Sequence, residues 1–181
     1  MKNQIKITSY IILFTLIFSC NKIQSDNKFY QYEQLKTSIN VKSIVVDINN
    51  RECTLESVCN RKNTLIVRIK DSGTGCGECL ENILEIIKSN KKIVREKTVI
   101  FLSTDNIRYF RILADKVKPF QLYAIGANAI KLPIDELGKP FFFIKVERSN
   151  SPIKYFVPER GKIGSEMTEQ YLDEVAKYMS D

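Results

Sequence analysis

Apolar and polar positions along the chain follow two patterns, one typical of buried strands and one typical of amphipathic helices. Residues 65–69 are apolar except for Arg68, which is the pattern of a strand inside a sheet. Residues 80, 83, 84 and 87 are Leu, Ile, Leu and Ile, and this i, i+3, i+4, i+7 spacing marks one face of a helix. The sequence therefore predicts a strand and a helix joined by the stretch Gly75-Cys76-Gly77-Glu78-Cys79.

Apolar runs of strand length recur on both sides of this unit. They lie at residues 43–48, 98–102, 120–125, 141–146 and 153–157. Two apolar strands separated by a helix predict a parallel pair with a right-handed crossover. The last two runs are close enough in sequence to pair as an antiparallel hairpin. The order β, α, β, α, β, β, α, after an N-terminal strand, predicts an α/β fold.

Two further helices complete the pattern. Asp105 or Asn106 is suited to cap a helix that Pro119 stops, and its apolar side is expected to hold residues 107, 110, 113, 114 and 117. Residues 167–179 form the last predicted helix, with residues 167, 171, 172, 175, 178 and 179 on one side. Residues 126–138 are predicted to be a loop.

The first 19 residues have the pattern of a secretory signal. Lys2 and Lys6 precede an apolar run at residues 10–18, which is shorter than the roughly 20 residues needed to span a bilayer. Cys20 directly follows Ile-Phe-Ser, which resembles a bacterial lipobox, where the cysteine is lipidated and becomes the first mature residue. The alternative is a plain signal peptide cut near Ser19. We expect a signal peptide at 1–19, a lipidated tether and linker at 20–40, and a folded domain at 41–181.

The lipobox resemblance implies a bacterial cell-envelope protein, anchored to the membrane by lipid and facing the periplasm. Asn21 follows Cys20, which by resemblance to bacterial sorting rules favours the outer membrane. Removing residues 1–19 lowers the formal net charge from +7 to +5 and leaves 162 residues, enough for one domain. The basic residues are spread thinly, so nucleic acid is not expected as a partner. The chain has no histidine, which excludes histidine-dependent catalysis and most catalytic zinc sites.

Cys76 and Cys79 form a C-x-x-C motif where the predicted strand ends and the helix begins. Unpaired N–H groups and the positive end of the helix dipole lie at such a helix start, and both favour a thiolate. Cys76 is nearest the helix start and is expected to be the nucleophile. Cys79, one turn later, is expected to be the resolving thiol. The alternative is that these cysteines form a purely structural disulfide.

Cys53 and Cys59 lie before the central strand, with five residues between them. Because disulfides are expected outside the cytoplasm, the favoured pairing is local, Cys53 with Cys59 as a structural staple and Cys76 with Cys79. Cys53 and Cys59 could instead be a second redox couple or unpaired thiols. A zinc site from all four cysteines is compatible with their spacing, but we expect no metal and no other cofactor.

The layout resembles the thioredoxin fold over residues 62–179. The C-x-x-C motif closes the first βα turn, and Lys139-Pro140 stands at the start of the 141–146 strand, where thioredoxin-like proteins carry a cis-proline beside the disulfide. The chain resembles a Bacteroidetes-type lipoprotein of the thioredoxin-like thiol-disulfide oxidoreductase group. This resemblance implies a three-layer α/β/α domain with a central mixed sheet and an extra N-terminal strand, and a cis Pro140 beside the active site.

Arg68 stands on the central strand, about where many thioredoxins bury an acidic residue that moves protons for the resolving thiol. Two interpretations remain open. Arg68 could point under the cysteines, where it would favour the thiolate but could not accept a proton. It could instead be a strand residue whose guanidinium reaches solvent at the sheet edge.

The resemblance implies an enzyme that exchanges disulfides with protein thiols and works with a redox partner protein. Cys76 would attack, a mixed disulfide would form, and Cys79 would resolve it. The alternative is a non-enzymatic lipoprotein that uses the same fold as an interaction module, with a structural disulfide.

Overall fold

The computed structural model describes residues 38–59, 63–70, 77–104, 106–126, 129–130, 132–146, 149, 151–159 and 161–180, and of residues 77–80, 162 and 163 only the backbone. The predicted signal peptide, Cys20 and most of the predicted tether lie outside these residues. The predicted domain boundaries therefore remain predictions.

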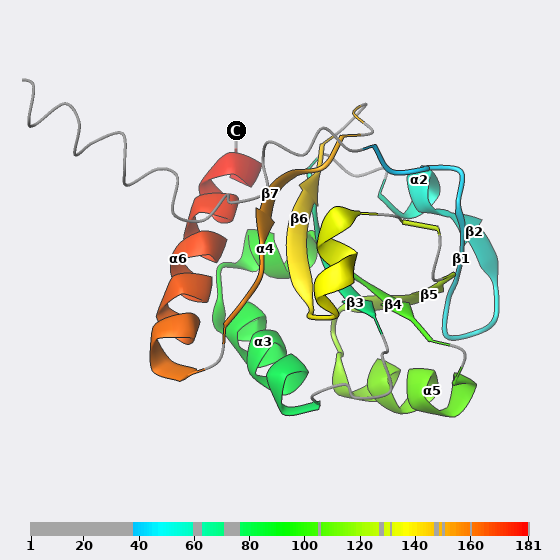
Figure 1. Cartoon of the computed structure of the whole chain (residues 1–181), viewed down its shortest axis with the longest axis horizontal. Coiled ribbons are helices and arrows are strands. Elements are labelled where there is room, and N and C mark those ends of the chain that lie inside the picture. The colour runs from blue at the N-terminus through cyan, green and yellow to red at the C-terminus, as the bar shows by residue number, and fades with distance from the viewer. Residues whose placement is uncertain are drawn as a thin grey trace, which may run out of the picture.

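Seven strands form one mixed sheet in the order β2-β1-β5-β4-β3-β6-β7 (Figure 1). β3, β4 and β5 are parallel neighbours, while β1 pairs antiparallel with β2 and β5, and β6 pairs antiparallel with β3 and β7. The predicted mixed sheet, parallel central pair, hairpin and N-terminal strand are thus confirmed. The strands are β1 (Ile44–Val46), β2 (Glu52–Thr54), β3 (Thr64–Lys70), β4 (Thr98–Ser103), β5 (Gln121–Ile125), β6 (Phe141–Lys145) and β7 (Ile153–Phe156).

Helices cover both faces of the sheet, which confirms the three-layer α/β/α arrangement. The crossovers from β3 to β4 and from β4 to β5 run in the same direction across the sheet. Because such crossovers are right-handed, their helices pack on the same face. The short α2 and the 3₁₀ turn η1 pack on the opposite face. The helical elements are α2 (Leu55–Val58), α3 (Gly77–Ser89), α4 (Lys92–Glu96), α5 (Ile107–Lys116), η1 (Pro133–Leu137) and α6 (Gly161–Ser180).

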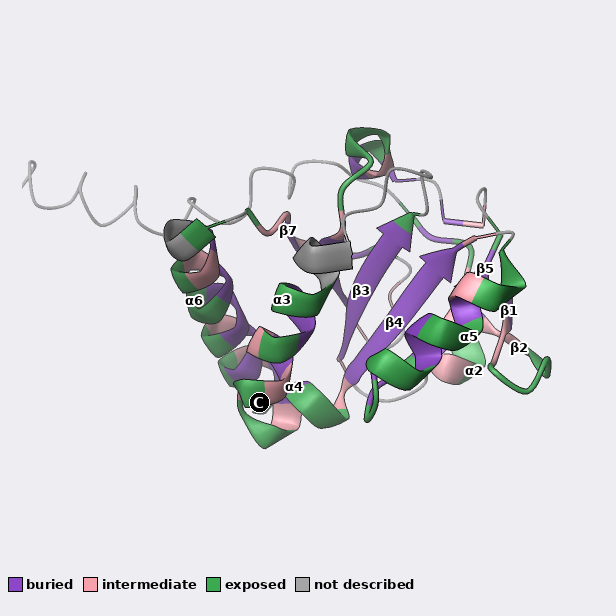
Figure 2. Ribbon diagram, turned by 90° about the horizontal axis from the view of Figure 1, so that it is seen from below, coloured by how far each residue is buried: buried purple, intermediate pink, exposed green. Residues whose placement is uncertain are grey.

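β3 separates two hydrophobic cores, and both of its faces are buried (Figure 2). Leu65, Val67 and Ile69 point into the larger core, which the buried faces of α3 to α6 complete. Ile66 points into the smaller core, together with side chains from α2, η1, β4 and β6. A strand buried in this way lacks apolar-polar alternation, which explains why residues 65–69 are apolar except for Arg68.

Helix α5 begins as the sequence predicts. The Asn106 side chain accepts a hydrogen bond from the Tyr109 amide at 2.9 Å, so Asn106 is the N-cap. Phe110, Leu113 and Val117 are buried as predicted. Ile107 is not, because it is the first residue of the helix and is 63% exposed.

The sequence did not reveal the shortest elements. α2, α4 and η1 have at most five residues each, too few to show a helical period. α4 begins three residues after α3 ends, and η1 lies within the loop predicted at residues 126–138.

Three aromatic rings join the β6–β7 hairpin to α6. Phe156 stacks on Tyr171 with ring centroids 4.6 Å apart, and Phe142 stacks on Tyr171 at 5.8 Å. The Tyr171 hydroxyl donates a hydrogen bond to the carbonyl oxygen of Lys154 at 2.8 Å. The polar tip of this ring is therefore paired although the side chain is buried.

Replacing Phe142 by alanine should lower the free energy of unfolding by about 3–5 kcal/mol, because it removes the middle ring of β6 and leaves a cavity under α6. Urea denaturation followed by circular dichroism measures this loss. The control Ile107→Ala removes an exposed side chain and should change the unfolding free energy by less than about 0.5 kcal/mol. A loss as small for Phe142→Ala as for the control would contradict this account of the core.

Candidate active site

The C-x-x-C motif follows the buried strand β3 along the chain and runs into the first turn of helix α3. β3 ends at Lys70 and α3 begins at Gly77. Cys76 lies outside the described residues, and Cys79 belongs to the first turn of α3, where the backbone alone is described. The roles predicted for Cys76 and Cys79 therefore remain predictions, but the two elements that bracket the motif are in place.

α3 is held on the sheet by one apolar face. Ile83, Leu84 and Ile87 are at most 5% exposed and pack against the larger core. This packing directs the start of α3 towards the edge of the sheet at which β3 and β4 end. A helix start carries unpaired amides and a partial positive charge, which stabilise an anion placed there. The described backbone thus provides the electrostatic setting expected to favour a thiolate.

Pro140 lies beside the end of β3. In the antiparallel β3–β6 pair, Arg68 is opposite Phe141, so Pro140 precedes Phe141 at the end of the strand that leads to the motif. Its predicted cis geometry is wrong. The Lys139–Pro140 bond is trans, the form preferred for X–Pro bonds, and the cis bond in the described chain is Lys118–Pro119.

Arg68 does not reach solvent, so that interpretation is wrong. Its side chain is fully buried, and its Nε lies 3.2 Å from Oδ1 of Asp135 in η1. Its Nη1 donates a hydrogen bond to the carbonyl oxygen of Ile69 at 2.9 Å. Burial lowers the pKa of Arg68, and the nearby carboxylate of Asp135 partly opposes this shift. Because residues alternate along a strand, Arg68 shares the face of Ile66, opposite the face on which α3 packs.

Cys53 and Cys59 are free thiols, so the predicted disulfide between them is not formed. The Cys53 sulfur lies 3.8 Å from the carbonyl oxygen of Val45, across the β1–β2 pair. Cys59 follows α2 and is buried in the smaller core at 1% exposure. Desolvation raises the pKa of Cys59 to about 12, although the charge of Lys145 opposes the shift. A thiol so buried and protonated is a poor nucleophile.

Sequence reasoning missed Asp135 as a member of this region. Asp135 is the third residue of η1, and its Oδ2 accepts a hydrogen bond from the Leu132 amide at 3.0 Å. Pro133 at the first position and an acid two residues later are the usual signals of a helix start, and these were present in the sequence. Nothing local to residue 135 could have shown that its partner is on β3.

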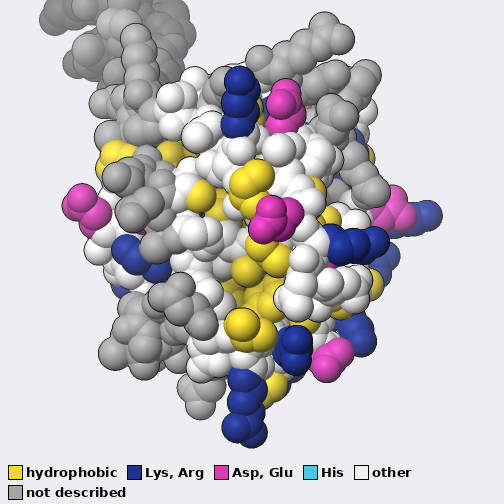
Figure 3. Space-filling view, turned by 90° about the vertical axis from the view of Figure 1, so that its right-hand side faces the viewer, with side chains coloured by type: hydrophobic (Ala, Val, Ile, Leu, Met, Phe, Trp, Pro, Cys, Tyr) yellow, Lys and Arg dark blue, Asp and Glu magenta, His cyan; other side chains and the backbone are white. Residues whose placement is uncertain are grey.

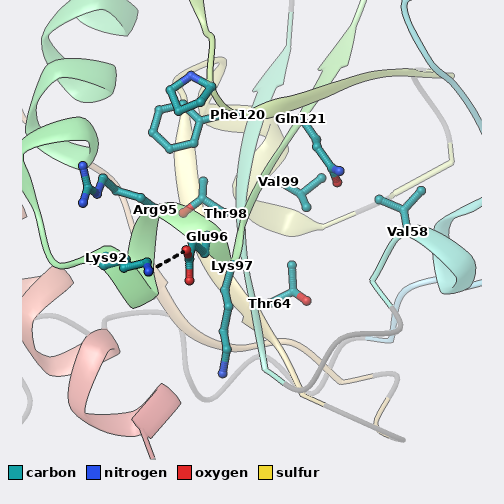
Figure 4. A pocket seen from close by; sticks show the side chains of 11 residues that line it. Val58, Thr64, Lys92, Arg95, Glu96, Lys97, Thr98, Val99, Phe120 and Gln121 are labelled. Atoms are coloured by element: carbon teal, nitrogen blue, oxygen red, sulfur yellow. Dashed lines mark ion pairs between the residues drawn. The ribbon is translucent and has the colours of Figure 1, made fainter.

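A hollow of about 380 Å³ lies at the opposite edge of the sheet, where β3, β4 and β5 begin (Figure 4). Three basic side chains line it, Lys92, Arg95 and Lys97, and two of them contact other groups. Lys92 pairs with Glu96 at 3.6 Å, and Lys97 donates to the carbonyl oxygen of Met179 at 3.0 Å. Because its charges do not converge on a common point, this hollow is a weaker candidate than the end of β3.

The side of the molecule that carries β1 and β2 shows apolar side chains at its surface (Figure 3). Ile44 and Ile48 are 51% and 47% exposed. Lysine and arginine side chains alternate with acidic ones around this apolar area, so the part of the chain drawn in colour on this face has no uniform basic stripe.

Two further observations concern the described residues alone. None of the helices found there is both long enough and apolar enough to cross a membrane. No three histidine, cysteine, aspartate or glutamate side chains among them are grouped as metal ligands would be.

No protein-family model matches the sequence, and no curated protein matches it. Among solved structures, the chain is similar to a thioredoxin-like protein from Porphyromonas gingivalis, with 14% identity over 77% of this chain and 92% of that chain, at a TM-score of 0.51. It is also similar to a domain of a possible thiol-disulfide isomerase from Cytophaga hutchinsonii (13% identity, 81% and 95% covered, TM-score 0.52). A secreted disulfide oxidoreductase from Mycobacterium tuberculosis is a third match (8% identity, 74% and 96% covered, TM-score 0.50). These likenesses confirm the predicted thioredoxin-like fold.

The buried thiol of Cys59 should make the protein less stable at alkaline pH. Below pH 9 the thiol is protonated in both states, and its contribution to stability is complete. Between the ordinary pKa of 9.0 and the raised pKa of about 12, only the unfolded state ionises. The unfolding free energy should therefore fall by about 1.4 kcal/mol per pH unit in this window through Cys59 alone.

Urea denaturation at several pH values between 8 and 11, in the presence of reductant, measures this slope. Cys59→Ala should lose this part of the alkaline slope, whereas the control Cys53→Ala should keep it. An unchanged slope in Cys59→Ala would show that the thiol is not buried as described.

Proposed function

We propose that this protein is a thiol-disulfide oxidoreductase of the bacterial cell envelope, anchored to the membrane by a lipid on Cys20 and acting on protein thiols. One observation carries the proposal. A C-x-x-C sequence joins the central strand β3 to helix α3 in a thioredoxin-like fold. The M. tuberculosis structure similar to this chain is described as a secreted disulfide oxidoreductase, which agrees with the proposed activity and with a location outside the cytoplasm.

The proposed chemistry uses only the two cysteines and a client disulfide. The Cys76 thiolate attacks one client sulfur, a mixed disulfide forms, and the other client sulfur leaves as a thiolate. The Cys79 thiolate then attacks the Cys76 sulfur and releases the second client thiol. Two electrons pass to the client, and Cys76 and Cys79 become a disulfide. A redox partner protein must reduce that disulfide again, or the whole sequence runs in reverse on client dithiols.

Exposed side chains in the segment before β6 support the proposed binding of an extended client peptide near the end of β3. Pro140 is partly exposed, and Leu137 on η1 is 47% exposed. Peptides bind to folds of this kind through backbone hydrogen bonds supplemented by contacts with apolar side chains. We therefore place the client on the same side as Pro140, at the end of β3.

A redox titration of the full chain in detergent, with thiol alkylation read by mass spectrometry, tests the proposed couple. Cys76 and Cys79 should titrate together at a potential within roughly −270 to −120 mV, the range of known redox proteins. Cys53 and Cys59 serve as internal controls because they should stay reduced over this range. A Cys76–Cys79 disulfide that persists below about −300 mV is a structural one and supports the non-enzymatic interaction module instead.

Replacing the resolving thiol should trap the client. Cys79→Ser should accumulate mixed disulfides through Cys76 with envelope proteins, because the second step cannot occur. Non-reducing electrophoresis followed by mass spectrometry detects and identifies these adducts. The control Cys76→Ser/Cys79→Ser should form none. If Cys79→Ser folds but forms no more adducts than this control, the exchange mechanism is wrong.

Replacing Cys20 by serine removes the thiol that would carry the lipid. The variant should therefore leave the membrane fraction. Metabolic labelling with a fatty-acid analogue should mark the wild type and not Cys20→Ser. Separation of inner and outer membranes on a density gradient then tests the preference for the outer membrane. Labelling of both forms, or of neither, would contradict lipidation at Cys20.

A further inference from the structure

Arg68 is the one charged side chain of β3 that the structure buries completely. In the strand register it lies between Phe101 of β4 and Phe141 of β6, and both rings belong to the smaller core. An arginine remains charged in proteins, so its burial among aromatic side chains carries a large desolvation cost. This position therefore needs an explanation other than packing.

The carboxylate that faces Arg68 gives only partial compensation. Nε and Oδ1 of Asp135 are 3.2 Å apart, but neither atom makes a well-aligned hydrogen bond with the described residues, and nor does Nη2. Apolar replacements of such buried pairs are often as stable or more stable than the pair itself. We therefore expect the pair to contribute little to the free energy of unfolding and to favour one arrangement of the chain over others.

Asp135 organises the whole turn that precedes β6. Its Oδ2 accepts from the Leu132 amide at 3.0 Å, and its carbonyl oxygen accepts from the Gly138 amide at 3.2 Å. Gly138 has a φ of +61°, a conformation that a side chain disfavours, and Pro140 follows two residues later. An ionic contact to Asp135 therefore fixes the beginning and the end of this turn together.

Arg68 holds the same segment from a second point. As the β3 partner of Phe141, it stands one pair away from Pro140 in the sheet. Its Nη1 also donates to the carbonyl oxygen of Ile69, which lies next to the end of β3. One side chain thus connects the strand that leads to Cys76 with the turn that leads to Pro140.

We propose that Arg68 and Asp135 are a positioning pair that fixes the segment 132–140, and with it the client-binding side of the site, against the end of β3. This inference rests on the proposed function. Neither residue is assigned a part in the covalent steps.

The test uses the full chain and a double substitution that neutralises the pair without leaving one charge buried alone. Arg68→Met/Asp135→Asn keeps a side-chain oxygen for the Leu132 amide, so it should fold even where Arg68→Met does not. The matched control Lys91→Met/Asp173→Asn neutralises an exposed pair with the same kind of contact, at 3.0 Å. Thermal unfolding of each variant establishes that it is folded.

Amide hydrogen exchange, read by mass spectrometry, reports the position of the segment without requiring activity. In the neutral double variant, residues 132–141 should exchange about tenfold faster than in the wild type, while α3 and β4 should be unchanged. For reduction of a peptide disulfide, KM should rise about tenfold with kcat changed less than about twofold, because client positioning and not thiol chemistry is lost. The control variant should leave the amide exchange of residues 132–141 and the KM unchanged.

Each outcome decides the inference. Unchanged exchange at residues 132–141 would show that the pair does not position the segment. Faster exchange with an unchanged KM would show that the pair shapes the turn but not the site, which also overturns the proposal. A wild type that does not reduce the peptide disulfide contradicts the proposed function, and amide exchange then decides the positioning role by itself.

Discussion

The burial of β3 on both faces is the constraint on which the rest of the structure depends. From Thr64 to Ile69 no residue is more than 6% exposed. Such a strand needs a partner on each edge and a layer on each face, and β4, β6 and the two cores supply them. The right-handed crossovers then place α3 and α5 on one face, so the opposite face is left to short elements and turns.

That opposite face has to accommodate a charge. Two cationic side chains of the central strands, Arg68 and Lys145, are buried there, and their hydrogen-bond and ion-pair partners differ. The Lys145 ammonium donates a hydrogen bond to the carbonyl oxygen of its neighbour Val146 at 3.0 Å. Arg68 faces Asp135, which is far away in sequence and belongs to a turn of five residues. The cost of burying Arg68 thereby becomes a preference for one position of that turn.

The same geometry explains why the candidate site lies at one edge of the sheet. β3 and β4 end there, α3 begins there, and the turn that carries Pro140 returns there to start β6. Along the chain, β3 and α3 thus bracket the short stretch that contains Cys76. The hollow at the other edge has basic residues, but two of them contact groups elsewhere, Lys92 the carboxylate of Glu96 and Lys97 the carbonyl oxygen of Met179 in α6.

The sequence by itself determined the order of the main strands and helices, the Asn106 cap and the location of the C-x-x-C motif where a strand gives way to a helix. Periodicity reports which residues must be buried, and caps act within one turn, so both are local properties. Tertiary structure alone decided that Arg68 is buried against Asp135 and that Cys53 and Cys59 remain apart. The cis form expected for Lys139–Pro140 came from the family resemblance, whereas the structure has the trans form that X–Pro bonds generally prefer. The physical reason is that the cost of a buried charge or a free thiol depends on which distant groups the fold brings beside it.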